Sequence, residues 1–242
     1  MKFAVPLIEG RLVRRYKRFL ADIELADGSL VTAHCANPGA MLGLVVPGSR
    51  VLLSASTNPA RKLGFSWELV EADLPGGPQW VGINTMRPNA LVAEAFAEGR
   101  LPPLVGYGSL HPEVRYGRAS RVDFLATGEG LPPCHVEVKN CHLLREPGLA
   151  EFPDCVAARS ARHMDELTEV VAQGGRAMLI IVVQMQAERF DVARDLDPAF
   201  DRAFARAAAG GVEIHAHCCR IDPSGITFAD AIPVMPPGRG GL

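Results

Sequence analysis

Residues 176–184 read RAMLIIVVQ, an almost unbroken run of apolar and β-branched side chains. A strand with one face in water alternates polar and apolar residues, whereas a strand buried on both faces is apolar throughout. The run therefore predicts the central strand of a sheet that is covered on both sides. A helix predicted over 154–173 precedes it and ends at Gly174 and Gly175, which favours an α/β domain.

Helical and strand patterns alternate from residue 84 onward. The segment NALVAEAFAEGR places apolar residues at helical spacing and stops near Gly99. A further helix is expected over 198–209, followed by the strand VEIHAHCCRI. Residues 84–234 are thus expected to form one α/β domain, and the tail, 235–242, is expected to be disordered.

Residues 1–83 carry a different pattern, in which short apolar segments are separated by tight turns. The expected strands are RFLADIEL, SLVTAHC, RVLLSAS, SWELV and QWVGIN. The Asp27-Gly28 pair between the first two suits a hairpin because both residues tolerate positive φ. Several short strands of this kind predict a small β-barrel or sandwich.

Composition sets broad limits on the class of protein. The chain has 242 residues, 48% hydrophobic and 21% charged, and its formal net charge of -2 indicates neither an acidic nor a basic partner. The six cysteines lack the paired spacing of a zinc site, and nothing ahead of them resembles a secretory signal. The longest apolar runs are far shorter than a membrane span. We therefore expect a cytoplasmic protein with reduced thiols and no membrane association.

The stretch DFLATGEGLPPCHVEVKN carries the strongest chemical signal. Alternation along a strand puts Glu137 and Lys139 on one face and turns Val136 and Val138 toward a core. Asp123 lies in a second apolar run, and the glycines and prolines between the runs favour a hairpin that brings the two carboxylates together. Such carboxylates repel unless they share a cation, and hard oxygen ligands suit Mg²⁺ or Mn²⁺. The alternative is an exposed hairpin with an incidental polar face, since Glu-x-Lys is a common string.

A basic cluster lies near the start of the chain. It consists of Arg11, Arg14, Arg15, Lys17 and Arg18, interleaved with Tyr16 and Phe19. Cations beside aromatic rings are typical of surfaces that neutralise phosphates and stack bases. A solvated strand or turn with surplus arginine explains the same residues equally well.

Together these segments resemble the sugar fermentation stimulation protein A family from near the first residue to about Val234. The resemblance rests on YKRFLAD, HCANPGAM, SWELV, VRYG with RVDF, VEVKN, FPD at 152–154, and the helix that carries Arg159, Arg162 and His163. It implies an N-terminal OB-like barrel, a second domain of the PD-(D/E)XK nuclease type, and a protein that binds DNA without sequence preference. The chain departs from the family pattern at Pro38, Ala157 and Ser160, where Thr, Thr and Gly are usual.

With this resemblance, two activities are expected. In DNA binding, to single-stranded or structured DNA, the phosphate contacts would come from Arg14, Arg15, Lys17, Arg18, Arg159, Arg162 and His163, with Tyr16 available for stacking. In Mg²⁺-dependent phosphodiester hydrolysis, Asp123, Glu137 and the backbone carbonyl of Val138 would hold the metal, and Lys139 would stabilise the transition state or orient water. Glu94, from the preceding helix, could supply a further carboxylate.

Two other interpretations stay open. The first is a non-enzymatic regulator of sugar metabolism genes that keeps the nuclease fold as a DNA-binding scaffold, because a fold does not establish an activity. The second is a transition-metal site built from His135, His142, His215 and His217. No ligand spacing joins these four residues, and core or surface histidines explain them better. The helix face that carries Arg159, Arg162 and His163 is also consistent with a surface that only contacts solvent.

Overall fold

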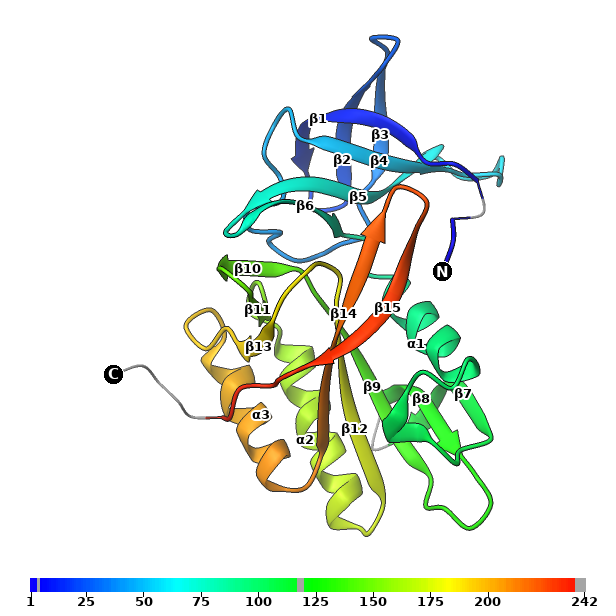
Figure 1. Ribbon diagram of the computed structural model, residues 1–242, viewed down its shortest axis with the longest axis vertical. Helices are drawn as coiled ribbons and strands as arrows, with labels where there is room; N and C mark the ends of the chain where they lie inside the picture. The colour runs from blue at the N-terminus through cyan, green and yellow to red at the C-terminus, as the bar shows by residue number, and fades with distance from the viewer. Residues whose placement is uncertain (4, 117–119, 238–242) are drawn as a thin grey trace.

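The computed structural model describes residues 1–3, 5–116 and 120–237, which form two domains, one above the other in Figure 1. The strands of the first domain are β1 (Ile8–Tyr16), β2 (Leu20–Leu25), β3 (Leu30–His34), β4 (Arg50–Ala55), β5 (Phe65–Leu74) and β6 (Gly77–Gly82). They pair in the order β3-β2-β1-β4-β5-β6, and a further pairing of β3 with β5 closes a barrel. The expected OB-like barrel is confirmed.

Local sequence explains why this barrel forms. The hairpin between β2 and β3 turns at Gly28, whose φ of 81° lies in the region that favours glycine. Along β2 the residues Ala21 and Ile23 alternate with more exposed positions and point into the barrel. Trp67 of β5 is fully buried there and gives the barrel its largest core side chain.

The second domain is built on a six-stranded sheet. Its strands, in spatial order, are β15 (Gly225–Ile232), β14 (Glu213–Asp222), β12 (Arg176–Val183), β9 (Cys134–Cys141), β8 (Ser120–Thr127) and β7 (Ser109–Tyr116). β12 runs parallel to both of its neighbours, β9 and β14. The apolar run at 176–184 therefore forms the centre of the sheet, as its composition predicts.

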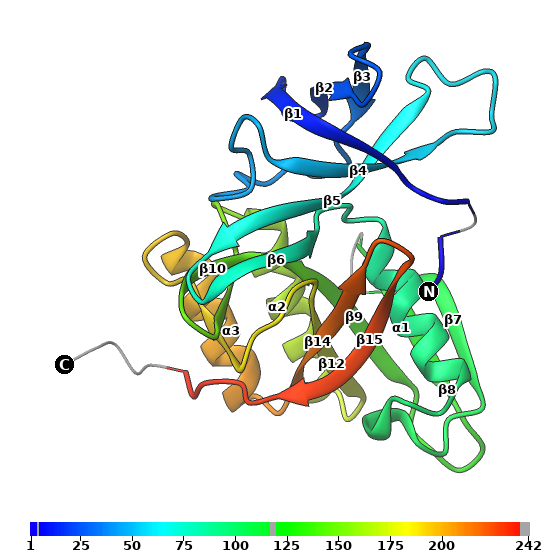
Figure 2. The same cartoon turned by 45° about the horizontal axis from the view of Figure 1, so that its top comes forward.

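Helices cover both faces of this sheet. The helices are α1 (Arg87–Ala97), α2 (Ala158–Ala172) and α3 (Pro198–Ala209), with a short 3₁₀ turn, η1 (Pro102–Leu104), after the first. Alternate residues of β12 divide between two cores: Leu179 and Ile181 pack with α2 and α3, whereas Met178 and Ile180 pack with α1. Figure 2 shows the two groups of helices on opposite sides of the sheet.

Some elements differ from the sequence-based expectation. The sequence signals did not predict the edge strands β7 and β15, or the small sheet of β10 (Leu143–Glu146), β11 (Leu149–Phe152) and β13 (Arg189–Val192). The helix expected from residue 154 begins at Ala158, because the Asp154 carboxylate accepts a hydrogen bond from the Met41 N–H instead of capping the helix. Residues 238–242 of the expected disordered tail lie outside the described residues. In the described part of the chain, every helix is too short or too polar to cross a membrane.

Candidate nuclease site

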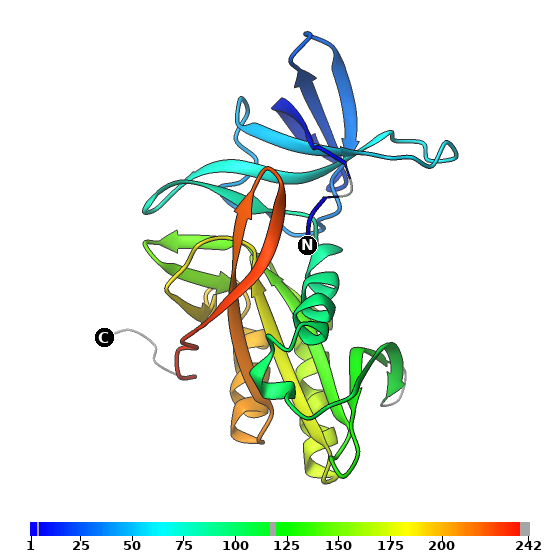
Figure 3. The same ribbon diagram turned by 45° about the vertical axis from the view of Figure 1, so that its right-hand side comes forward.

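A cavity of about 610 Å³ lies where the barrel meets the second domain. The barrel contributes Arg18 and the loop residues Asn37, Pro38 and Gly39. The second domain contributes residues at the beginning of α1, on β7, β8 and β9, and at the beginning of α2. In Figure 3 α1 descends from below the barrel. Residues at the beginning of this helix, Pro88 and Asn89, line one part of the cavity.

Asp123 and Glu137 meet in this cavity because strands β8 and β9 separate. Their pairing extends only as far as Phe124 and Val136. Beyond that point the Asp123 side chain replaces the neighbouring strand: Oδ2 accepts a hydrogen bond from the Val138 N–H at 2.8 Å. The other oxygen, Oδ1, accepts one from Asn89 Nδ2 of α1 at 2.9 Å. The predicted hairpin therefore forms, and it brings both carboxylates to one cavity.

Glu137 is 2% exposed, and its two carboxylate oxygens have different surroundings. Oε1 interacts with Lys139 Nζ at 2.5 Å and also with His163 Nδ1. Oε2 is buried and has no hydrogen-bond partner among the described residues. A buried charged oxygen without a partner is costly, so this atom is a ready ligand for a cation.

The pKa values of the two carboxyl groups move in opposite directions. Burial raises the pKa of Asp123, and the charge of Glu137 raises it further, against the bonds from Val138 and Asn89. Burial also pushes the pKa of Glu137 upward, but the hydrogen bond from His163 and the charge of Lys139 outweigh it, so that this pKa lies below its ordinary value. Opposite shifts in adjacent carboxyl groups are typical of functional sites.

The donor set fits a hard divalent cation. Two carboxylates suffice for Mg²⁺, which keeps several waters and takes further oxygens from a phosphate. By contrast, no group of three or more His, Cys, Asp or Glu in the described chain has an arrangement that could hold a metal. The four histidines considered from the sequence do not form a common site, and each has its own neighbour: His135 near Tyr116, His142 on Asp154, His215 near Glu213 and His217 on Phe228.

The basic cluster of the barrel divides into groups with different contacts. Arg14 and Tyr16 both bind the Asp22 carboxylate, at 2.8 and 3.1 Å. Arg15 donates to backbone carbonyls, including those of Asn37 and Gly39 at 2.8 and 2.9 Å, so it supports the loop that lines the cavity. Lys17 and Arg18 form the exposed turn between β1 and β2, and Arg18 lines the cavity itself.

The site residues predicted on the two helices lie in different places relative to the cavity. Arg159 and His163 line the cavity, whereas Arg162 is exposed and is not one of its lining residues. His163 is 3% exposed and contacts Glu137. Its ring therefore faces the carboxylate and is not exposed for the phosphate contact expected from the sequence. Glu94 lies elsewhere: its carboxylate binds the Met1 ammonium at 2.6 Å and lines a second cavity, because it faces β15 and the N-terminus.

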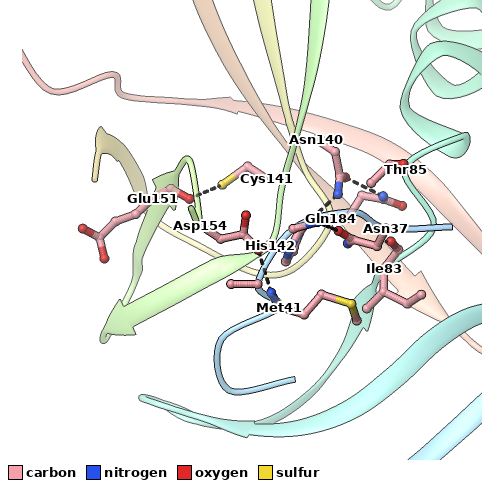
Figure 4. Close-up of polar contacts among 12 residues, drawn as sticks. Asn37, Met41, Ile83, Thr85, Asn140, Cys141, His142, Glu151, Asp154 and Gln184 are labelled. Carbon is pink, nitrogen blue, oxygen red and sulfur yellow. Dashed lines mark hydrogen bonds and ion pairs between the residues drawn. The ribbon is translucent and has the colours of Figure 1, made fainter. Parts of the chain in front are cut away.

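Sequence reasoning missed several residues of the site. Asn89 and Arg121 flank Asp123, but single polar residues of this kind carry no spacing signal. The motifs HCANPGAM and FPD carried a stronger sequence signal, since both support the family resemblance. In the structure they contact each other across the domain junction. Asp154 accepts hydrogen bonds from the Met41 N–H at 2.7 Å and from His142 Nε2 at 3.1 Å, as Figure 4 shows.

A closed barrel joined to an α/β sheet that presents Asp, Glu and Lys in one cavity defines a two-domain protein of nuclease-type fold. The family model described as "SfsA N-terminal OB domain" matches residues 13–83, and the one described as "Sugar fermentation stimulation protein RE domain" matches residues 86–225. The chain belongs to the sugar fermentation stimulation protein family.

Similar proteins span the whole chain. A sugar fermentation stimulation protein homolog from Methylorubrum populi is 72% identical and covers 99% of both chains. The homolog from Methylobacterium nodulans is 74% identical and covers 97% of this chain and 99% of its own. Among solved structures, Pyrococcus furiosus SfsA in complex with Ca²⁺ matches with a TM-score of 0.87 at 25% identity, over 97% of this chain and 98% of that one.

Proposed function

We propose that this protein binds DNA without sequence preference and hydrolyses phosphodiester bonds in the cavity between its two domains, with Mg²⁺ or Mn²⁺ as cofactor. The observation that carries the proposal is the convergence of Asp123, Glu137 and Lys139 in one cavity, with the buried Oε2 of Glu137 left without a partner among the described residues. A surface that only bound DNA would gain nothing from a buried, unsatisfied carboxylate oxygen.

Each residue has a distinct role in this proposal. Asp123, Glu137 and the backbone carbonyl of Val138 would hold the cation, which would supply polarisation of the phosphate and a lower pKa for water. Lys139, already 2.5 Å from Glu137, stabilises the negative charge that develops on the phosphate or orients the attacking water. The solved Pyrococcus furiosus protein is a complex with Ca²⁺, which supports a site for an oxygen-ligated divalent ion in this family.

DNA binding in the proposal depends on exposed cations around the cavity. Lys17 and Arg18 contact the phosphate backbone from the barrel, and Arg159 and Arg162 from α2. Arg14, Arg15 and Tyr16 support this surface, while His163 contributes through Glu137. Because such contacts displace counterions, binding weakens steeply with salt. The proposal includes a cytoplasmic location, since all six cysteines are free thiols, as is usual in reducing compartments.

Cleavage of labelled single-stranded and duplex DNA tests the hydrolytic activity. The purified protein is assayed with Mg²⁺, Mn²⁺ or a chelator, beside Glu137→Ala, Asp123→Ala and the control Glu98→Ala, which removes an exposed carboxylate outside the cavity. We expect metal-dependent cleavage that falls by roughly a hundredfold or more in the two cavity variants, as when a key electrostatic group is lost. The control should retain full activity.

The opposite result would favour the scaffold interpretation. If no cleavage occurs with either metal while all proteins bind DNA in a salt-sensitive way, the protein is a DNA-binding regulator that keeps the nuclease fold. Cleavage at an equal rate in Glu137→Ala and in the parent protein would also exclude the proposed site, because the cleavage would then not depend on Glu137.

A further inference from the structure

Two large apolar side chains are left exposed at the cavity between the domains. Met86, just before α1, is 74% exposed, and Val156, just before α2, is 73% exposed. Both line the cavity, and they come from its two helical sides. Single exposed apolar residues are common on protein surfaces, but two at the edges of one cavity form a contact surface for an apolar ligand face.

The same cavity carries the charges that a phosphate backbone requires. Arg18, Arg121 and Arg159 are exposed and line it, from the barrel, from β8 and from α2 respectively. Lys139 lines the same cavity and binds the Glu137 carboxylate. A ligand that satisfies both groups of side chains must present apolar faces and phosphates to the same cavity, which is the chemistry of a nucleotide chain.

The two exposed apolar side chains, Met86 and Val156, favour single-stranded DNA over duplex DNA. In a duplex the base faces are stacked on one another, so a protein meets phosphates, sugars and the base edges in the grooves. Apolar side chains at the rim would then face charged backbone. An unpaired strand exposes its base faces, which can bury such side chains. The volume of about 610 Å³ is in the range of sites for small ligands and suits a short unpaired segment better than a double helix.

We infer that the cavity selects single-stranded DNA, with bases packed on Met86 and Val156 and phosphates held by Arg18, Arg121 and Arg159. This inference rests on the proposed function, since it names the form of DNA that the same site takes.

The test measures equilibrium binding in a chelator, so that no strand is cut. The probes are a fluorescent oligodeoxynucleotide without self-complementarity and the duplex of the same sequence. The variants are Met86→Ser and Val156→Ser, and the matched control is Val105→Ser, which changes a side chain that is also 74% exposed but does not line the cavity. All three side chains are exposed, so the substitutions remove no buried side chain from the core.

We expect the parent protein to bind the single strand more tightly than the duplex. Met86→Ser and Val156→Ser should each weaken single-strand binding by about tenfold, as expected for one aliphatic side chain that is no longer buried. Their duplex binding should be unchanged, and Val105→Ser should match the parent on both probes.

Equal or tighter duplex binding by the parent, or variants indistinguishable from Val105→Ser, would overturn the inference. The two proposals fail separately. Metal-dependent cleavage of duplex and single strand at the same rate would leave the proposed function standing and remove the strand selectivity. A strand preference in a protein that cleaves nothing would leave the selectivity and remove the hydrolysis.

Discussion

At the scale of single residues, His163 determines which oxygen of Glu137 is free. Its Nε2 lies 3.3 Å from Arg159 Nε, which can only donate, so Nε2 accepts and Nδ1 carries the proton toward Glu137. Lys139 binds the same oxygen, Oε1. With both donors on one side of the carboxylate, Oε2 remains for a cation. His163 is thus a positioning residue, which acts through Glu137.

This arrangement predicts that His163→Leu lowers cleavage by about tenfold to a hundredfold, the effect typical of a lost partner of a metal ligand. The half-maximal Mg²⁺ concentration should rise, because Glu137 loses a bond that lowers its pKa and burial then favours its protonated form. His163→Asn keeps an N–H near the position of Nδ1 and should restore most of the activity. If His163→Leu leaves the Mg²⁺ dependence unchanged, the histidine has only a packing role.

At the scale of elements, the turn between β1 and β2 combines strain with positive charge. Lys17 and Arg18 have φ values of 48° and 62°, a conformation that favours glycine or asparagine over long side chains. Strain of this kind is usually retained where it serves a function. Here it holds Arg18 at the cavity and Lys17 beside it in the exposed turn, with the Arg18 carbonyl fixed by Arg15 Nε at 3.0 Å.

Replacing the pair by Lys17→Asn with Arg18→Gly should therefore stabilise the protein and weaken DNA binding. We expect the free energy of unfolding to rise by about 1 to 2 kcal/mol in denaturant titrations. The slope of the logarithm of the DNA-binding constant against the logarithm of the salt concentration should become shallower, by the equivalent of roughly one to two phosphate contacts. The control, Arg202→Ala with Arg206→Ala, removes two exposed cations from α3 and should leave the salt slope unchanged. An unchanged stability would show that the turn is not strained.

Elements with a strong local pattern could be predicted from the sequence, and those set by tertiary contacts could not. The apolar run of β12 identified the centre of the sheet, whereas β7 contains Pro112, which is typical of an edge strand and hides its pattern. The strands β10, β11 and β13 are only four residues long. In the site, alternation in β9 predicted Glu137 and Lys139, but the second partner of Glu137, His163, comes from α2, and no local pattern reveals this contact.

At the scale of the whole molecule, buried polar contacts join the two domains. Glu68 of the barrel is 1% exposed and binds Arg87, at the beginning of α1, through two hydrogen bonds. Asp154 binds the N–H of Met41 in a barrel loop, and Gly39 packs so closely on its carboxylate that a Cβ would lie 2.5 Å from its oxygens. Breaking such a contact leaves an unpaired buried group, so the domains should unfold together.

Asp154 gives this junction a dependence on pH. Burial raises its pKa, but the hydrogen bond and charge of His142 and the Met41 N–H outweigh burial and lower the pKa from 3.8 to about 2. Since the pKa in the folded state is the lower one, the stabilisation is complete above the unfolded value of 3.8 and is lost as the pH falls toward 2.

We therefore expect Asp154→Asn to cost about 2 kcal/mol of unfolding free energy at pH 7, the equivalent of the shift in pKa. The difference from the parent should shrink as the pH falls from about 4 toward 2, because protonation removes the same charge from the parent protein. Denaturant titrations across this pH range measure the difference, with the exposed Asp73→Asn as control. A difference that is constant with pH would mean that Asp154 joins the domains by its shape and hydrogen bonds, independently of its charge.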